Sequence, residues 1–190
     1  MMISHTHKCI MLKPRKTGGT SIQKALFGIT EGNHESLSEI KREAGAIWHK
    51  YFKFVFVRNP WDMMVSRYHF NIMKHADDPF LPNDFKDWLH SWLRYRQGKG
   101  HTNADLHHQH LYILQDEEVA VDYIGRFENL NHDFTQLCQR LGFPSPNLPH
   151  LHKTDHSHYS TYYDRESSGW VRQFFKKDIR LLRYARVKML

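Results

Sequence analysis

The sequence predicts an α/β fold of three layers, in which helices flank a mainly parallel central sheet. Apolar runs of strand length at 9–12, 52–57 and 119–127 are each followed by a segment with helical signals. Strands that alternate with helices pair in parallel, because each helix returns the chain to the same end of the sheet. Ligands of such a sheet bind at the carboxyl ends of its strands, where both basic motifs of this chain begin.

The first strand leads into helix-forming residues 22–26 through a basic loop with two glycines, Lys13-Pro14-Arg15-Lys16-Thr17-Gly18-Gly19-Thr20-Ser21. The glycines allow the backbone to approach a ligand closely, and the first N–H groups of the helix point toward that ligand. Lys16 adds positive charge, while Thr20 and Ser21 add hydroxyl donors. The loop therefore predicts a cradle for phosphate or sulfate; the alternative is a basic turn with ordinary helix-capping hydroxyls.

The second strand is followed at once by Arg58-Asn59-Pro60-Trp61-Asp62. Asn59 can cap a helix and Pro60 can begin it, and apolar residues then continue the helical pattern to about Lys74. Ser66 lies about two turns along this helix, so Arg58 and Ser66 can bind one anion from two elements. The alternative is that Arg58 pairs with Asp62 and that Ser66 only packs.

The remaining segments supply further elements. Ser36 and Glu39 form a capping box that predicts a short helix to about Glu43. A helix over 132–141 follows the third strand, and loops are predicted at 77–82, 96–102 and 144–149. Large apolar residues at helical spacing predict a packed helix, not an aromatic binding site: Phe85, Trp88, Leu89, Trp92 and Leu93.

Composition limits the classes of protein to which this chain can belong. A chain of 190 residues, 40% hydrophobic and 14% aromatic, predicts one folded domain over 1–190 and excludes general disorder. A formal charge of +7 favours anionic partners, yet no helix-turn-helix, zinc-finger or RNP pattern indicates nucleic acid. Two cysteines, Cys9 and Cys138, are too few for a disulfide scaffold, and we expect both to be reduced and structural. Residues 1–13 lack a secretory signal, and no apolar run spans a membrane, so we expect a cytoplasmic location.

Together, the two basic motifs resemble the phosphosulfate loop and the 3′-phosphate motif of sulfotransferases that use 3′-phosphoadenosine 5′-phosphosulfate (PAPS). The resemblance is nearest to the carbohydrate branch, with the heparan-sulfate 2-O and HNK-1 enzymes and small bacterial relatives. That branch carries Pro-Lys-Thr-Gly-Gly-Thr-Ser and Arg-Asn-Pro-x-Asp-Arg-x-x-Ser-x-Tyr; segments 122–130 and 148–184 also look like the family. Two residues depart from it: Arg15 is inserted before Lys16, and Met63 replaces the Arg after Asp62.

The resemblance implies in-line transfer of a sulfuryl group from PAPS to an acceptor hydroxyl, with a carbohydrate as the expected acceptor and no metal. Arg58 and Ser66 are then expected at the 3′-phosphate, and Phe127 at the adenine unless it is a core ring. Lys153 and Thr154 are expected to close over the nucleotide unless they form a plain surface turn. The P-loop-like segment is expected to bind the 5′-phosphosulfate, through Lys16, Thr17, Gly18, Gly19, Thr20 and Ser21.

Catalysis needs a cation at the leaving oxygen and a base at the acceptor. Lys16 is the candidate cation. His34 occupies the place between the two motifs where the resembling enzymes carry their base; the alternatives are a histidine that caps the helix at Ser36, or Glu31 or Glu35 as the base. Acceptor identity, a glycan or a small molecule, and oligomeric state are left open.

Two other classes of function remain as alternatives. A nucleotide-dependent kinase is disfavoured because Lys16 precedes both glycines, unlike the Lys of a Walker A loop, and because Asp62 alone is a poor Mg²⁺ site. A basic anion-binding or nucleic-acid-binding module would not need two motifs at strand ends. Histidine groups at 107–110, 150–152 and 156–158 lack the cysteine pair or HExxH pattern that would support a metal site.

Overall fold

The computed structural model describes residues 2–32, 34–75, 82, 84–98, 108–144, 147–149, 151 and 156–185. The chain forms two compact units. The first comprises Met1–Arg58 and Leu106–Leu151, and the second comprises Asn59–Asp105 and His152–Leu190. That these units make one domain over 1–190 stays a prediction.

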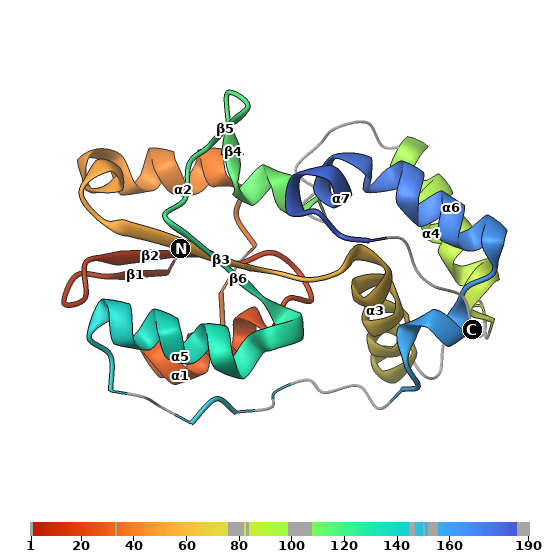
Figure 1. Ribbon diagram of the computed structural model, residues 1–190, viewed down its shortest axis with the longest axis horizontal. Coiled ribbons are helices and arrows are strands. Elements are labelled where there is room, and N and C mark those ends of the chain that lie inside the picture. The colour runs from red at the N-terminus through yellow and green to blue at the C-terminus, as the bar shows by residue number, and fades with distance from the viewer. Residues whose placement is uncertain are drawn as a thin grey trace. The chain divides into compact units, whose positions relative to one another are not determined.

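The first unit is built on a four-stranded sheet with the order β1-β2-β3-β6 (Figure 1). Its strands are β1 (Met2–Ser4), β2 (Cys9–Leu12), β3 (Phe52–Val57) and β6 (Tyr123–Arg126). The β2–β3 and β3–β6 pairs are parallel, whereas β1 pairs with β2 in antiparallel fashion at the edge. The predicted α/β class with a mainly parallel sheet is therefore confirmed, and the two strands at 9–12 and 52–57 have the predicted bounds.

Helices cover both faces of this sheet (Figure 1). On one face, α1 (Gly19–Phe27) and α5 (Leu130–Leu141) pack against the apolar side chains of β2 and β3; α2 (Leu37–Ala44) lies on the other. The predicted capping box opens α2: Ser36 Oγ accepts from the Glu39 N–H at 3.3 Å, and the Glu39 carboxylate accepts from the Ser36 N–H at 2.7 Å. This second bond favours the ionised form and lowers the pKa of Glu39. Cys9 and Cys138 are free thiols buried in this core, as expected.

The predicted strand over 119–127 is wrong at its start. Residues Glu118–Val119 form β5, which pairs with β4 (Leu114–Gln115) in a separate hairpin, and β6 begins only at Tyr123. Asp116 and Glu117 adopt φ values of +50° and +64°, which close the hairpin in the left-handed region. Asp122 then joins the hairpin to the sheet, because its carboxylate accepts from the Lys53 N–H at 2.7 Å.

Short 3₁₀ turns complete the first unit: η1 (Gly45–His49) follows α2, η3 (Gln109–Tyr112) precedes β4, and η4 (Phe127–Asn129) joins β6 to α5. The helix predicted over 132–141 corresponds to α5, which begins two residues earlier, at Leu130.

The second unit consists of helices: α3 (Pro60–Lys74), α4 (Phe85–Gly98), η5 (Tyr159–Tyr162), α6 (Arg165–Phe174) and α7 (Lys176–Leu182). Asn59 caps α3, since its Oδ1 accepts from the Trp61 N–H at 3.0 Å, and Pro60 begins it as predicted. Aromatic rings of α3, α4, η5 and α6 fill the core, in which Met63 is 2% exposed. An Arg at position 63 would be a buried charge there.

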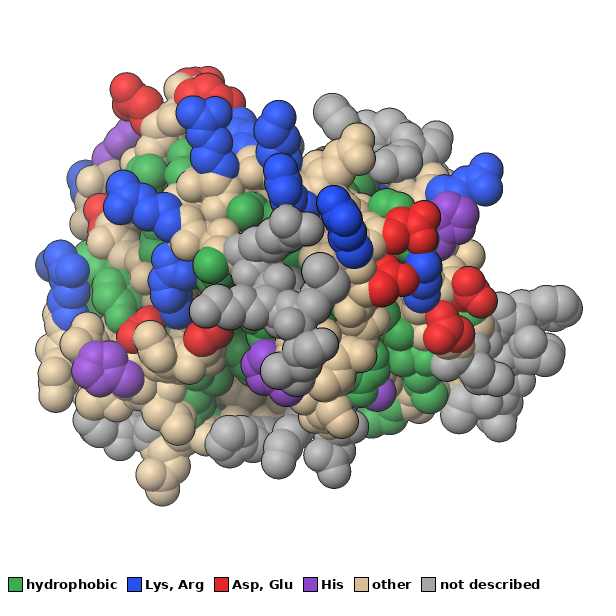
Figure 2. Space-filling model, turned by 45° about the vertical axis from the view of Figure 1, so that its right-hand side comes forward, with side chains coloured by type: hydrophobic (Ala, Val, Ile, Leu, Met, Phe, Trp, Pro, Cys, Tyr) green, Lys and Arg blue, Asp and Glu red, His purple; other side chains and the backbone are tan. Residues whose placement is uncertain are grey.

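Most of the predicted loop at 77–82 and part of the segments 96–102 and 144–149 lie outside the described residues, although α4 continues through Gly98. In the described part of the chain, no helix is long and apolar enough to cross a membrane. Lysine and arginine side chains are spread over the face drawn in Figure 2, with acidic side chains among them.

Gly125 has a packing role that the sequence did not reveal, and it gives a first prediction. It pairs with Phe56 across β3 and β6, and a Cβ at Gly125 would overlap the Phe56 ring. We expect Gly125→Ala to lower the free energy of unfolding by about 1–3 kcal/mol, measured by urea denaturation. The same change in a Phe56→Leu background should cost clearly less; an equal cost in both backgrounds would contradict this account.

Candidate functional site

The basic loop between β2 and α1 has an alternating backbone. Lys16 has a φ of +61° and Gly18 a φ of +79°, whereas Thr17 between them lies outside the left-handed region. Alternation of this kind turns successive N–H groups into a concavity, called a nest, that binds anions. A left-handed non-glycine residue costs about 1–2 kcal/mol, so the loop stores strain at Lys16.

The N-terminus of α1 adds to this nest. The helix begins at Gly19, three residues earlier than expected, so that Gly19, Thr20 and Ser21 form its first turn. Its N-cap is Gly18, no side chain caps it, and its first turn holds no acidic residue. In contrast, the first turns of α2, α3, α5 and α6 each contain a carboxylate. The positive end of α1 and its first N–H groups therefore favour an external anion.

The loop hydroxyls differ in their surroundings. The Thr17 hydroxyl donates to the Pro14 carbonyl at 3.0 Å and is buried, so it holds the turn closed. Ser21 Oγ accepts from the Leu151 N–H at 3.1 Å, and its own proton can still be donated. Thr20 and Lys16 are half-buried. The Thr17 hydroxyl is therefore engaged within the protein, whereas the Ser21 hydroxyl keeps a proton to donate.

Both glycines are also required by packing. A Cβ at Gly18 would lie 3.2 Å from Leu130 and 3.3 Å from Phe127, and one at Gly19 would lie 2.7 Å from Cγ of Lys13. The glycines thus admit close neighbours on the protein side as well as a ligand.

Arg58 extends from the carboxyl end of β3 to this loop. Its guanidinium donates to the Lys16 carbonyl at 3.1 Å and lies 3.9 Å from the centre of the Phe127 ring. Arg58 is 6% exposed, while Phe127, in η4 directly after β6, is half-buried. The structure thus brings together Arg58, Phe127 and the basic loop at the ends of three neighbouring parallel strands.

Gln109 is a site residue that sequence reasoning missed. Its Oε1 accepts from the Arg58 N–H at 2.7 Å, and its Nε2 donates to the Arg58 carbonyl at 2.7 Å. This fully buried amide replaces the strand partner that the backbone would have at this point. A single glutamine between His108 and His110 carries no sequence signal for such a role.

His34 lies beside the start of the loop. Its Nδ1 is 2.8 Å from the Lys13 carbonyl, and since a carbonyl only accepts, Nδ1 carries the proton. In the neutral imidazole the lone pair is then on Nε2, and that form of a histidine can act as a base. The other proposed role, capping of α2, is filled by Ser36. Glu31 is exposed and Glu35 half-buried.

The other predicted residues belong to the second unit or lie outside the described residues. Ser66 is 3% exposed on α3 in the second unit, and its pairing with Arg58 stays a prediction. Lys153 and Thr154 lie outside the described residues, as do His107, His150 and His152.

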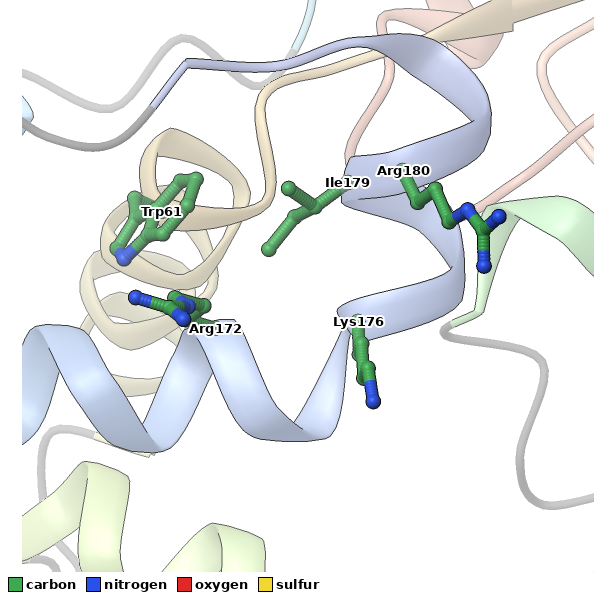
Figure 3. Close-up of a pocket in the computed structure, with 5 residues that line it drawn as sticks. All are labelled: Trp61, Arg172, Lys176, Ile179 and Arg180. Atoms are coloured by element: carbon green, nitrogen blue, oxygen red, sulfur yellow. The ribbon is translucent and has the colours of Figure 1, made fainter.

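The second unit contains a cavity of about 290 Å³ lined by Trp61, Arg172, Lys176, Ile179 and Arg180 (Figure 3). Trp61 and Ile179 form its apolar part, and the cations come from α6 and α7. None of the residues predicted for the site lines it.

A mostly parallel α/β sheet with an anion cradle at its strand ends defines a class of proteins that bind phosphate or sulfate groups. Comparison with known families narrows this class, because the model of the sulfotransferase family matches residues 1–185. The chain therefore belongs to the sulfotransferase family, as its motifs suggested.

A protein of Archaeoglobus fulgidus is 30% identical over 96 residues, which are 50% of this chain and 70% of that protein. Its name, "Uncharacterized protein", states no activity. No solved structure matches the chain significantly.

The Gln109 contacts give a second prediction. Gln109→Leu leaves two buried backbone groups of Arg58 without their partner, so we expect the free energy of unfolding to fall by about 2–4 kcal/mol. Gln109→Glu keeps the acceptor but loses the donor. Its free energy of unfolding should therefore lie between those of wild type and Gln109→Leu. Urea denaturation measures both variants; a Gln109→Leu protein as stable as wild type would show that the clamp is not needed.

Proposed function

We propose that this protein transfers a sulfuryl group from PAPS to a hydroxyl of an acceptor, for which we expect a carbohydrate. The observation that carries the proposal is the contact of Arg58 with both the Lys16 carbonyl and the Phe127 ring. It joins the loop suited to a 5′-phosphosulfate to the arginine suited to a 3′-phosphate. A nucleotide with phosphates at both positions would bind two neighbouring anion sites of this kind.

Donor binding is proposed as follows. The nest and the first turn of α1, with Lys16, Thr20 and Ser21, bind the 5′-phosphosulfate. Arg58 and Ser66 bind the 3′-phosphate, the guanidinium as a fork and the hydroxyl as a single donor. Phe127 offers ring surface to the adenine. Lys153 and Thr154 are proposed to close over the nucleotide.

The reaction is proposed to run in line. The acceptor oxygen forms a bond to sulfur while the bond from sulfur to the bridging phosphate oxygen breaks, and 3′-phosphoadenosine 5′-phosphate leaves with that electron pair. Nε2 of His34 takes the proton of the acceptor hydroxyl. Lys16 stabilises the negative charge that grows on the bridging oxygen, so the scheme uses no metal ion.

A third prediction tests the donor. Calorimetry with EDTA should show tighter binding of 3′-phosphoadenosine 5′-phosphate than of ADP, because only the former has a 3′-phosphate. Ser66→Ala should weaken the former by about 10-fold or more and leave ADP binding unchanged. Arg58→Ala also removes the bond to the Lys16 carbonyl, so it should weaken both ligands, but the 3′-phosphorylated one more.

The control for Ser66 is Ser168→Ala, which removes a hydroxyl buried to a similar degree in the second unit, 2% against 3% exposed. It should bind both nucleotides as wild type does. Equal affinity of the wild type for the two nucleotides would overturn the PAPS proposal. Preference for ATP with Mg²⁺ would instead support a kinase, and weak salt-sensitive binding of every anion would support a basic binding module.

A fourth prediction concerns the base. His34→Ala should lower kcat for sulfation by about 10²–10⁴-fold and leave the affinity for 3′-phosphoadenosine 5′-phosphate unchanged. Wild-type activity should fall toward acid pH, because a protonated base accepts no proton, and this fall should be missing from the variant. Transfer of labelled sulfate from PAPS to a panel of glycans and small alcohols measures both. Loss of the same size in Glu31→Gln or Glu35→Gln, with His34→Ala active, would move the base to a carboxylate.

A further inference from the structure

Lys13 is a buried lysine at the point where β2 ends. The residue is 6% exposed, and its Nζ donates to Oε1 of Gln23 at 2.5 Å. Gln23 is fully buried on α1, and its Nε2 donates to the carbonyl of Glu31. Two side chains therefore connect the end of β2, the middle of α1 and the segment that leads to His34.

The backbone of Lys13 holds the other end of that segment, because its carbonyl accepts the Nδ1–H of His34 at 2.8 Å. Glu31 and His34 are thus both attached to Lys13, one through Gln23 and one directly. The described residues between α1 and α2 form no helix or strand of their own. Gly32 crosses close above Gln23, since a Cβ on it would lie 3.3 Å from Nε2. These contacts, which we call the Lys13 brace, fix the position of a segment without regular structure.

Stability does not account for a lysine at this place. A cation buried against a neutral amide loses hydration without gaining a counter-charge from that amide, and burial accordingly lowers the pKa of Lys13. The aliphatic part of the side chain packs over Gly19, which Met could do without burying a charge. A costly polar arrangement of this kind beside a candidate site is expected where it serves function.

We propose that Lys13 and Gln23 are positioning residues that hold Glu31 and His34 so that Nε2 of His34 faces the acceptor hydroxyl at the basic loop. The inference rests on the proposed function, in which His34 is the base. Lys13 and Gln23 act through His34, so their loss is expected in kcat and not in donor affinity.

Three variants of the whole chain test the brace. Gln23→Leu removes both side-chain bonds, and Gln23→Glu keeps an acceptor for Lys13 but cannot donate to the Glu31 carbonyl. Each should lower kcat by about 10–100-fold, as expected for a displaced catalytic group, with unchanged affinity for 3′-phosphoadenosine 5′-phosphate. The double variant Lys13→Met/Gln23→Leu replaces both partners with apolar groups of similar shape. It should regain wild-type thermal stability while kcat stays low, which separates positioning from folding.

A double-mutant cycle with His34 adds a readout that a structural role would not change. In a His34→Ala background, Gln23→Leu should alter kcat by less than about twofold, because no base remains to be positioned. Gln115→Leu is the matched control, since it breaks another Lys–Gln bond in the first unit, from Lys41 Nζ to Gln115 Oε1 at 2.9 Å. It should keep wild-type kcat.

The outcomes separate the two proposals. An enzyme that transfers sulfuryl groups and needs His34, but keeps its kcat in Gln23→Leu, overturns the brace alone. So does a Gln23→Leu loss of equal size with and without His34, or full kcat in the Lys13→Met/Gln23→Leu variant. A wild-type protein that shows neither preference for the 3′-phosphorylated nucleotide nor transfer from PAPS overturns both proposals.

Discussion

The contacts of Arg58 connect the parts of the candidate site. Its guanidinium lies between the Lys16 carbonyl of the basic loop and the ring of Phe127. Its backbone N–H and carbonyl are both hydrogen-bonded to the side chain of Gln109. The loop is strained at Lys16, and a bond to the carbonyl of that residue helps to keep the strained conformation. A positive side chain therefore both shapes the cradle and adds charge to it. Such preorganisation limits the rearrangement that anion binding requires.

Much of the fold could be predicted because its signals are local. Apolar β-branched and aromatic runs predicted β2 and β3, and the Asn59-Pro60 pair and the Ser36–Glu39 box predicted the starts of α3 and α2. No sequence pattern predicted β1, which is three residues long and depends on pairing with β2. β5 and β6 were merged because no glycine or proline interrupts the run between them, and the β4–β5 hairpin was missed because its turn at Asp116 and Glu117 uses left-handed residues other than glycine. Tertiary pairing decides such segments more than propensity does.

The candidate site, like the fold, could be predicted where the signals are local and not where tertiary contacts decide. The glycine loop and Arg58 were recognisable because their residue types and order carry a chemical meaning by themselves. Gln109 and the Lys13–Gln23 pair were not, because a glutamine is most often a surface residue and only its contacts in the folded protein reveal its role. The binding role of Thr17 stays a prediction, and its hydroxyl donates to the Pro14 carbonyl. Sequence patterns indicated which segments lie together in the candidate site. The polar contacts that keep those segments in place are seen only in the folded protein.

The two cysteines of the chain can be used to measure whether the core of the first unit becomes exposed to solvent. Cys9 in β2 and Cys138 in α5 are fully buried, and burial raises the pKa of each thiol to about 11. Since thiolates react with alkylating reagents and thiols hardly do, both are shielded while the sheet and α5 stay packed. The second unit contains no cysteine, as the sequence has only these two. The rate of alkylation therefore follows exposure of one core alone, so slow labelling during turnover would mean that the sheet stays closed while the enzyme works.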